Sequence, residues 1–504
     1  MKRFLRILLF AISFLAAATI FPGPDNAFAG TYYIDFVSGN DANSGTSKSS
    51  PWQHAPGMQG CVANCGVKSP QPGDSFILKG GVTWPNATMR WSWAWSGNAS
   101  NRVYVGVDQT WYNSGVCGAS WCRPILDGGK AAITGGGHNL FLMIAADYFT
   151  LDNIEFRGAY FSGYDYGNNA FINPQTSQYV DIKNCYFHGW ANASASDSGT
   201  GILSDSHLPS LNVGMVIEYN IFDGSDTAEV QADPNCTGPC LGTLDALWYG
   251  PIVHHNIIRY VSNGYIGAAE SFHDNLVEYI RRSPDVTAHE NGFENNSDPC
   301  NGLLFYNNVI RHVVPGVTVW VAPQKGCAPT YVFNNVIYDT TAGNVMDIAD
   351  ALTNPGGSIY VLNNTIECGP DGNATYSCLN CPASYTACTL RNNHLITGNL
   401  TPILNLGASN LTTGNNVIQT QAVANGQSYV AGSNFSPTAG NGSTVLAGLN
   451  VTGLCSGNVA ALCTDTTLAG TRNALPRPAS GAWDAGAYQF VGAPAPPKNL
   501  RITP

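Results

Sequence analysis

Short hydrophobic runs recur along the chain, each with asparagine at nearly the same place. Residues 303–312 read LLFYNNVIRH and residues 331–339 read YVFNNVIYD, so an aromatic residue, two asparagines and two aliphatic residues return in the same order. Self-similarity at intervals of 20–50 residues indicates a solenoid, in which each repeat stacks on its neighbours. The asparagines at this place, which recur every 19 to 36 residues, are Asn153, Asn184, Asn220, Asn256, Asn275, Asn308, Asn335, Asn364, Asn393 and Asn416.

Each repeat consists of short β-rich runs broken by Gly, Asn, Asp or Pro, and no long segment has the helical period of 3.6. This pattern excludes helical solenoids and α/β winding, and the irregular interval argues against leucine-rich repeats. One turn of a parallel β-helix fits, because its loops can vary in length. Asn tolerates turn backbone angles, and stacked copies can form amide-to-amide hydrogen bonds. The predicted fold class is therefore all-β, a parallel β-helix solenoid of roughly ten or more coils with an N-terminal cap region and loop insertions.

The chain resembles the pectate-lyase-like superfamily of right-handed parallel β-helix proteins. The resemblance rests on the repeats from Asn153 to Asn416, on YYIDFVSGNDANSGTSKSSPWQ (32–53) with PGDSFILKGGVTW (72–84), and on WDAGAYQF (483–490), which looks like the last strand of such chains. It implies the fold but not one activity, since the superfamily includes lyases, hydrolases, esterases, epimerases, adhesins and viral depolymerases. The Arg-x-Pro-x-x-Arg string of one large pectate lyase group is absent. The Asn-Thr-Asp, Asp-Asp, Gly-His-Gly and Arg-Ile-Lys set of polygalacturonase-type hydrolases is absent too.

The first 29 residues have the pattern of a secretory signal peptide. A basic start precedes the apolar core ILLFAISFLAAATIF (7–21), and Ala-Phe-Ala (27–29) is a small-residue cleavage site. No other stretch is apolar enough to cross a membrane, so we expect a secreted protein, periplasmic or extracellular. The other predicted parts are the N-terminal cap and first coils (30–145), the central parallel β-helix (146–425), the C-terminal coils and cap (426–491) and a Pro-rich tail or truncated linker (492–504).

The composition favours a polysaccharide as partner. Net charge is −11, which makes nucleic acid a poor candidate because its binding needs clustered Lys and Arg. Charged residues make up only 11%, against about a quarter in ordinary globular proteins. The polar surface must therefore come from amides and hydroxyls, which suit contact with sugars. We expect a monomer.

Fifteen cysteines in an exported chain indicate disulfide bonds. Zinc is the alternative for the close pairs, but their spacings are irregular and no His has zinc-finger placement. Cys185 is left over, and inside its repeat it is expected to be a buried apolar residue. The cysteines that lie close together are Cys61/Cys65, Cys117/Cys122, Cys236/Cys240, Cys300/Cys327, Cys455/Cys463 and the group Cys368, Cys378, Cys381 and Cys388.

Three consecutive repeats place reactive residue types in one column. Aligned on their turn residues, they are DVTAHEN (285–291), GVTVWVA (316–322) and GNVMDIA (343–349). This alignment brings together His289, Trp320 and Asp347, which point outward if the alternate positions are core. Trp can stack on a sugar ring, while His and a carboxylate can transfer protons. The alternative interpretation is a polar face with one incidental Trp.

The segment RRSPDVTAHENGFENNSDPC (281–300) is the richest in such residues. Arg281 and Arg282 could neutralise the carboxylate of a uronic acid. His289 could act as a base, and Glu294 could act as an acid or orient the base.

Asp285, Glu290 and Trp320 are the candidates for substrate binding. The alignment turns Glu290 inward, where an unpaired charge is very costly, so either the strand ends before Glu290 or the alignment is displaced by one residue. A solvated loop held by a Cys300–Cys327 bridge is the alternative interpretation of the whole segment. No metal is assigned, although calcium is a candidate cofactor because Asp347 and a nearby Asp could supply oxygen ligands.

A second polar series follows the repeated asparagines. Its mixed charges favour a salt-bridged, solvated edge over a binding groove. The series consists of Arg157, His188, Asp223, Arg259, Glu278, Arg311 and Asp339.

Two classes of function remain open. The first is an exported enzyme acting on a polysaccharide, most simply a lyase on an acidic glycan, with His289 as base and Arg281 or Arg282 as neutraliser. A glycoside hydrolase using Glu294 and Asp347 as its carboxylate pair is the other enzymatic hypothesis. The second class is a non-catalytic glycan-binding or structural surface protein.

Overall fold

The structure is a computed structural model. The predicted signal peptide up to residue 28 and the Pro-rich tail lie outside the described residues. The described residues are 29–131, 140–161, 169–192, 199–203, 212–226, 244–281, 290–295, 300, 302–314, 317–340, 344–348, 356–368, 377–381, 385, 387–398, 402–404 and 411–490.

Three long sheets run the length of the molecule. Sheet 1 contains β1 (Thr31–Ile34), β2 (Ser75–Leu78), β5 (Val103–Gly106), β8 (Phe149–Asp152), β12 (Val180–Lys183), β16 (Val216–Glu218), β19 (Ile252–His254), β22 (Ser271–His273), β25 (Leu304–Tyr306), β28 (Thr330–Phe333), β31 (Ser358–Leu362), β34 (Ala387–Arg391) and β37 (Leu411–Gly414). Sheet 2 contains β3 (Thr83–Pro85), β6 (Ile125–Asp127), β9 (Glu155–Arg157), β13 (Tyr186–His188), β17 (Ile221–Asp223), β20 (Ile257–Arg259), β23 (Leu276–Arg281), β26 (Val309–Val314), β29 (Val336–Thr340), β32 (Thr365–Cys368), β35 (His394–Thr397) and β38 (Val417–Gln419). Sheet 3 contains β4 (Trp91–Trp93), β7 (Leu140–Ile144), β11 (Ala170–Asn173), β15 (Gly199–Leu203), β18 (Leu244–Trp248), β21 (Asn263–Gly267), β24 (Phe293–Asn295), β27 (Val319–Val321), β30 (Asn344–Ile348), β33 (Ser377–Asn380) and β36 (Ile403–Leu404).

A few short elements lie outside these sheets. Strands β10 (Tyr160–Phe161) and β14 (Ala191–Asn192) pair with each other. None of the helices in the described part of the chain has the length and apolarity that a membrane span requires. The helices are α1 (Ala63–Val67), η1 (Asn86–Thr88), α2 (Ser114–Cys117), α3 (Gln421–Gly426), η4 (Ala431–Ser433), η5 (Thr452–Leu454) and η6 (Gly457–Cys463).

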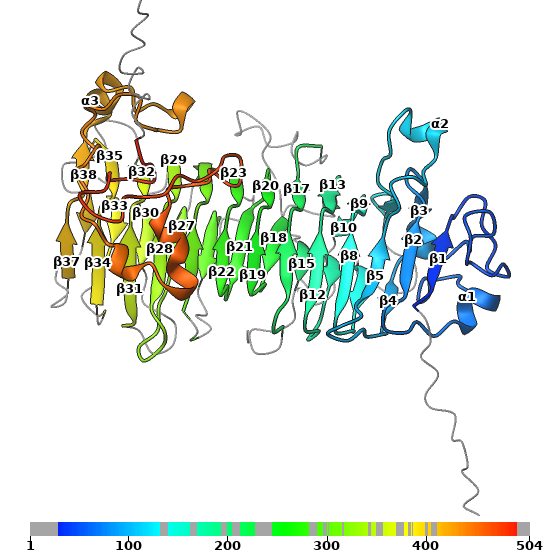
Figure 1. The fold of residues 1–504 in the computed structure, drawn as a ribbon. Helices are drawn as coiled ribbons and strands as arrows, with labels where there is room; N and C mark the ends of the chain where they lie inside the picture. Colours follow the sequence, from blue (N-terminus) through cyan, green and yellow to red (C-terminus); the bar gives the residue numbers. More distant parts are fainter. Residues whose placement is uncertain are drawn as a thin grey trace, which may run out of the picture.

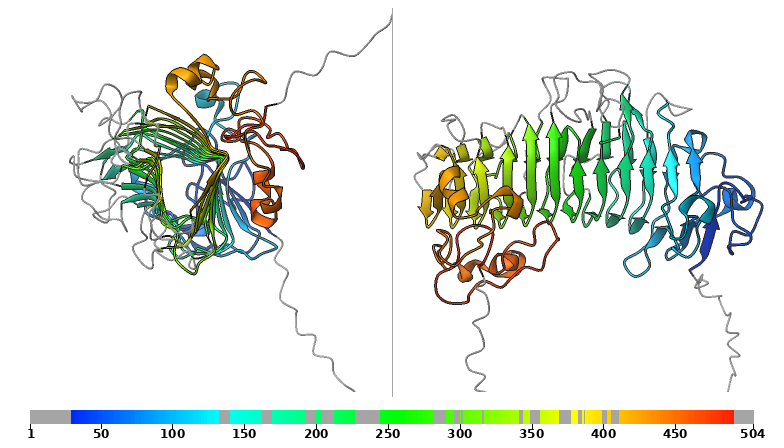
Figure 2. Two further views of the ribbon diagram at one scale, coloured as in Figure 1. Left: turned by 90° about the vertical axis from the view of Figure 1, so that its left-hand side faces the viewer. Right: turned by 90° about the horizontal axis from the view of Figure 1, so that it is seen from above.

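Each coil visits sheet 1, sheet 2 and sheet 3 in turn, and strands of successive coils pair in parallel. The three sheets therefore enclose a long interior, seen end-on in Figure 2, and the coils follow one another along the rod in Figure 1. The fold is the right-handed parallel β-helix that the repeats predict.

Buried asparagines form a continuous ladder at the corner between sheets 1 and 2. The Oδ1 of Asn335 accepts hydrogen bonds from the backbone N and the Nδ2 of Asn308, both at 3.0 Å. The Nδ2 of Asn308 also donates to the carbonyl of Phe272. The same arrangement repeats from Asn220 to Asn416, which confirms the predicted stacking of amides.

Asn153 and Asn184 were predicted as members of this ladder, and that prediction is wrong. Both have positive φ, 63° and 54°, and occupy the left-handed position directly before the ladder position. Cys185 takes the ladder position there, and its backbone N donates to the Oδ1 of Asn220 at 2.9 Å. Burial raises the pKa of the Cys185 thiol to about 12, as suits the predicted inert residue.

The interior is filled by aliphatic side chains and stacked aromatic rings. Phe272, Phe293 and Phe305 are fully buried, with ring centroids 4.6–5.6 Å apart. Truncating one such ring to Ala typically costs about 3–5 kcal/mol. Trp91 and Trp93 are buried in the same way, so they pack into the interior near the N-terminal end of the rod.

Apart from Cys185, the described cysteines pair as predicted, whereas Cys236 and Cys240 lie outside the described residues. The disulfides are Cys61–Cys65, Cys117–Cys122, Cys300–Cys327, Cys368–Cys378, Cys381–Cys388 and Cys455–Cys463.

Residues 421–490 add no further coil and fold back along the rod (Figures 1 and 2). Val459 and Trp483 pack on Phe333 at the outer face of sheet 1. Residues 483–490, expected to be a last strand, form none. Instead the backbone N of Gly486 donates to a carbonyl at the asparagine corner, so this segment covers the corner rather than extending the sheets.

Candidate functional site

A row of large and polar side chains runs along the outer face of sheet 3. Strand pairing sets Trp248 opposite Ile266, Ile266 opposite Glu294, and Glu294 opposite Trp320. The row continues through Asp347 to Asn380. The alternate positions face the interior, as fully buried Phe293 and Val319 show, so strand alternation directs the row outward.

Trp320 and Asp347 are therefore neighbours, as the alignment predicts, but the prediction of His289 as the third residue of this group is wrong. Glu294 occupies the place assigned to His289, because the strand of that coil is Phe293–Asn295. The alignment is displaced by five residues. Glu290 precedes the strand, so it has no place in the register of sheet 3, although it is only 6% exposed.

A second, shorter polar ladder supports this row at the corner between sheets 2 and 3. Asn263 donates from Nδ2 to Oδ1 of Asp245 at 2.6 Å and accepts at Oδ1 from the backbone N of Asn291 at 2.8 Å. Each end of the ladder holds one residue of the outer row. Trp248 donates from Nε1 to Oδ2 of Asp245 at 2.8 Å, and Asn291 donates from Nδ2 to Oε2 of Glu294 at 2.5 Å.

Glycines let this corner form. Gly264 and Gly292 follow the two ladder asparagines, and a Cβ on Gly264 would lie 2.3 Å from the carbonyl oxygen of Gly292. Any larger side chain would push successive coils apart. The short ladder therefore depends on the dipeptide Asn-Gly in consecutive coils.

Glu294 and its neighbour Asp245 are both buried, and burial affects the ionisation of this corner. Glu294 is 4% exposed. Burial raises the pKa of Asp245, donors from Asn263, Trp248 and Ser262 oppose the rise, and the charge of Glu294 adds to it. The pKa of Tyr249 is raised by burial and by the same Glu294 charge. Two carboxyl groups thus share one poorly solvated corner, a setting typical of proton-transfer sites.

Asp347 lies on the other side of Trp320. The Nδ2 of Asn380 donates to its Oδ1 at 2.7 Å, which orients the carboxylate. Glu294 and Asp347 are two coil steps apart, and at about 4.8 Å per step their backbones are separated by roughly 9.6 Å. Trp320 lies between these two residues in the register of sheet 3.

The remaining predicted site residues are only partly described. Arg281 ends β23, where its backbone pairs with Val314. Its side chain, and the whole of Asp285 and His289, lie outside the described residues, as does Arg282. Calcium at Asp347 stays a prediction.

The second polar series forms ion pairs along the outer face of sheet 2. Arg259 contacts Asp223 and Arg311 contacts Glu278, each at 2.7 Å. His188 lies between Asp226 at 2.6 Å and Glu155 at 3.1 Å. These opposite charges neutralise one another, which favours the salt-bridged edge over a binding groove.

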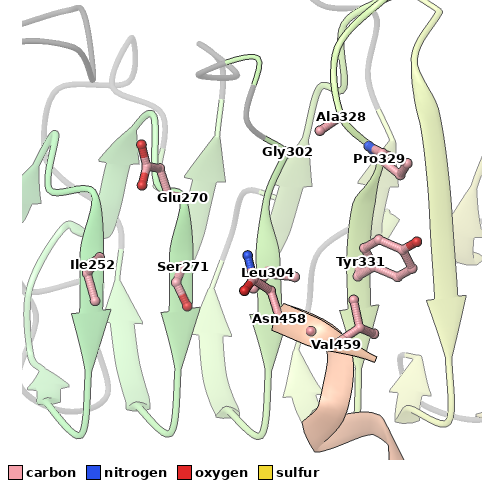
Figure 3. A pocket seen from close by; sticks show the side chains of 11 residues that line it. Ile252, Glu270, Ser271, Gly302, Leu304, Ala328, Pro329, Tyr331, Asn458 and Val459 are labelled. Atoms are coloured by element: carbon pink, nitrogen blue, oxygen red, sulfur yellow. The ribbon is translucent and has the colours of Figure 1, made fainter. Parts of the chain in front are cut away.

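A groove of about 570 Å³ lies on the outer face of sheet 1, beside η6 (Figure 3). Ser271, Leu304 and Tyr331 come from adjacent strands, and Val459 closes the groove from the C-terminal segment. Glu270 is the one charged residue in its described lining. The described lining therefore holds one carboxyl group rather than the pair that glycoside hydrolysis needs, and the row on sheet 3 is the better candidate.

Trp248, Asn291 and Asn380 are site residues that the alignment missed. The signal for Asn291 was present, because SNGYIG (262–267) and ENGFEN (290–295) share Asn-Gly at the same place. Aligning these two repeats gives the observed register and sets Ile266 opposite Glu294.

No protein-family model matches the sequence, and no curated protein matches it. Its structure is similar to that of pectate lyase Pel9A, with a TM-score of 0.43 and 13% identity over 92% of this chain and 97% of that chain. A rhamnogalacturonan lyase has a TM-score of 0.42 and 13% identity, covering 77% of this chain and 87% of that one. The GH136 lacto-N-biosidase from Eubacterium ramulus has a TM-score of 0.40 and 11% identity, covering 78% of this chain and 68% of that one. At these identities the likeness concerns the fold alone.

Proposed function

We propose that the protein is an exported enzyme that cleaves a polysaccharide lying along the row on sheet 3. The observation that supports this most directly is the placement of Glu294, Trp320 and Asp347 side by side in three consecutive coils. A glycan running along the rod would pass over Trp320 with a carboxyl group on either side. Aromatic rings stack on sugar faces, so Trp320 would hold the sugar that is cleaved.

Hydrolysis is the reaction that this arrangement supports best. Inverting glycosidases use two carboxyl groups about 6.5–9.5 Å apart, which leaves room for a water molecule between the base and the sugar. The two coil steps between Glu294 and Asp347 correspond to the upper end of that range. Glu294, which is 4% exposed and bonded to Asn291, is assigned as proton donor to the leaving oxygen. Asp347, oriented by Asn380, is assigned as the base that activates water.

Elimination by a lyase is the second candidate. It needs a base at the carbon beside the carboxylate and a group that neutralises that carboxylate. Arg281 ends β23, and Glu290 begins the short approach to β24, so the connection carrying Arg282 and His289 leads directly to Glu294. His289 as base and Arg281 or Arg282 as neutraliser would act at the same row.

Export accords with the disulfides, since such bonds persist in oxidising compartments. With the predicted signal peptide, they support a periplasmic or extracellular location.

A substrate screen separates these functions. The mature protein is incubated with neutral and acidic polysaccharides, and new reducing ends are measured together with the ultraviolet absorbance of unsaturated uronides. Reducing ends without that absorbance support hydrolysis, and both signals together support elimination. Binding without either signal would contradict an enzymatic function and leave a glycan-binding protein.

Substitutions then test the residues. For a hydrolase, Glu294→Gln and Asp347→Asn should each lower kcat by about 10²–10⁴-fold, the usual contribution of acid–base catalysis. Asp339→Asn, on the solvated edge of sheet 2, is the control and should leave kcat unchanged. For a lyase, His289→Ala should abolish turnover. Full activity of both carboxyl variants and of His289→Ala would contradict an active site on sheet 3.

A further inference from the structure

Four ionisable side chains meet where sheet 1 turns into sheet 2, far from the row on sheet 3. His254 and His273 end consecutive strands and are paired in register. Each is followed by a residue in the left-handed turn position, His255 with φ 57° and Asp274 with φ 55°. Two consecutive coils thus contribute His-His and His-Asp to one corner.

The donor atoms of three of these residues converge. One nitrogen each from His255 and His273 and one carboxylate oxygen of Asp274 all lie within 4.8 Å of one another. The Nδ1 of His273 is 2.6 Å from Oδ2 of Asp274. The rings of His254 and His273 stack with centroids 4.8 Å apart, and Tyr219 stacks on His255 at 4.7 Å, so both imidazoles are held in fixed orientations.

The folded-back C-terminal segment covers this cluster. Thr467 donates a hydrogen bond from Oγ1 to Oδ1 of Asp274. Gly470 lies against the His255 ring, because a Cβ there would come within 2.8 Å of the ring's Cδ2. The backbone N of Ala469 donates to the carbonyl of Asn307 at 3.0 Å. The cluster is therefore sandwiched between two coils and the covering segment.

We propose that His255, His273 and Asp274 form a binding site for a divalent transition-metal ion of the zinc type. Two imidazole nitrogens and one carboxylate oxygen are ligands that zinc prefers, whereas calcium takes six or more oxygens. Zinc bonds of about 2.0–2.2 Å place tetrahedral ligand atoms roughly 3.4 Å apart. Side-chain movements of about 1 Å would bring the three donor atoms from their present spacing to that distance.

Neighbouring groups complete the site. The Thr467 hydroxyl binds Oδ1 of Asp274, an orienting contact of the kind that tunes metal ligands. Oδ2, which now contacts Nδ1 of His273, would turn to the ion. The fourth ligand is water, since His254 is not among the residues whose donor atoms converge. Since Thr467 belongs to the covering segment, the ion ties that segment to the coils. This role is structural and independent of the reaction on sheet 3.

Calorimetric titration of the metal-stripped mature protein with zinc chloride tests the site. We expect one equivalent of zinc per chain. His255→Ala, His273→Gln and Asp274→Asn should each weaken binding by at least about 100-fold, since losing even an orienting contact costs 10–100-fold. His312→Ala is the matched control, because His312 pairs with Asp339 and lies outside the proposed site. This variant should bind zinc as tightly as wild type does.

A second readout separates metal binding from a folding defect. Zinc should raise the unfolding temperature of wild type and of His312→Ala in proportion to the logarithm of its concentration, but not that of His273→Gln. Cobalt in place of zinc should give the visible absorption of a tetrahedral site, and this should disappear in Asp274→Asn. Zinc binding that the three substitutions leave unchanged, or no binding by wild type, would overturn the proposal. If one variant fails to fold by circular dichroism, the other two decide.

Discussion

The molecule has two polar ladders at two corners of the same β-helix, and they differ in composition, length and surroundings. The ladder between sheets 1 and 2 is built of asparagines from Asn220 to Asn416, and each one bonds to the next in the same way. The ladder between sheets 2 and 3 spans Asp245, Asn263 and Asn291, and it begins with a carboxylate. Only the short ladder bonds to outward side chains that face a candidate substrate.

This difference separates stability from function. In the long ladder every amide satisfies buried backbone groups, so its role is to hold coils in register. In the short ladder one amide also orients Glu294, and the carboxylate holds Trp248. In this molecule, the hydrogen bond that repeats from coil to coil stabilises the fold, whereas the contacts that occur in one coil position the residues of the candidate site.

The largest effect is expected from breaking the long ladder. Asn335→Ala removes the acceptor of two Asn308 donors and the donor to the Phe305 carbonyl, all buried. Unsatisfied buried groups cost about 1–3 kcal/mol each, so the free energy of unfolding should fall by about 3–5 kcal/mol. Denaturant unfolding measures it. The active fraction should keep the wild-type kcat, and a loss of kcat would contradict the division of roles.

The short ladder should show the opposite pattern. Asn291→Ala leaves Glu294 without its 2.5 Å donor, and misplacing a catalytic group costs about 10²-fold in kcat, or about 2.7 kcal/mol in the barrier. KM should change little, because Trp320 is untouched. Steady-state kinetics on the substrate found by screening measures both constants. Equal losses of kcat in Asn291→Ala and Asn335→Ala would erase the distinction between the corners.

Acid should weaken the long-ladder corner through His394, which follows Asn393. Burial lowers the pKa of His394 to about 4, although a hydrogen bond with Gln419 opposes the shift. The unfolded chain has a His pKa near 6.5, so it binds the proton first and stability falls as pH drops from 6.5 towards 4. The loss at pH 5 is about 2 kcal/mol. Unfolding measured from pH 7 to pH 4 should therefore show a loss at pH 5 that is about 2 kcal/mol smaller in His394→Gln than in wild type.

The smallest effect is expected at Asp245, and its sign is opposite. Burial raises the pKa of this carboxyl group above its unfolded value, so its contribution is fully present below pH 3.8 and is lost as pH rises. Asp245→Asn should therefore flatten this part of the stability profile. The same unfolding measurements detect it. A steeper acid loss in wild type than in His394→Gln, with no change in Asp245→Asn, would show that only the long-ladder corner titrates.

Much of this organisation could be predicted from residues that repeat. The Asn-Asn motif predicted the stacked corner. The structure shows that its two asparagines differ, because Asn307 and its equivalents have positive φ, whereas Asn308 and its equivalents form the ladder. The close cysteine pairs and the neighbours Trp320 and Asp347 were likewise predictable. Glu294 was assigned a role but the wrong place, since loop length between sheets 2 and 3 varies from coil to coil.

By itself, the sequence determined the winding of the chain, because short β-rich runs with recurring amides can satisfy their backbone groups only by stacking. Tertiary structure alone decided which side chains meet across coils. The register of β24 depends on the Asn263–Asn291 hydrogen bond, a contact between residues 28 positions apart. Equally, the corner of His255, His273 and Asp274 is covered by Thr467, which is 193 positions from Asp274, because the C-terminal segment buries its apolar side chains against sheet 1.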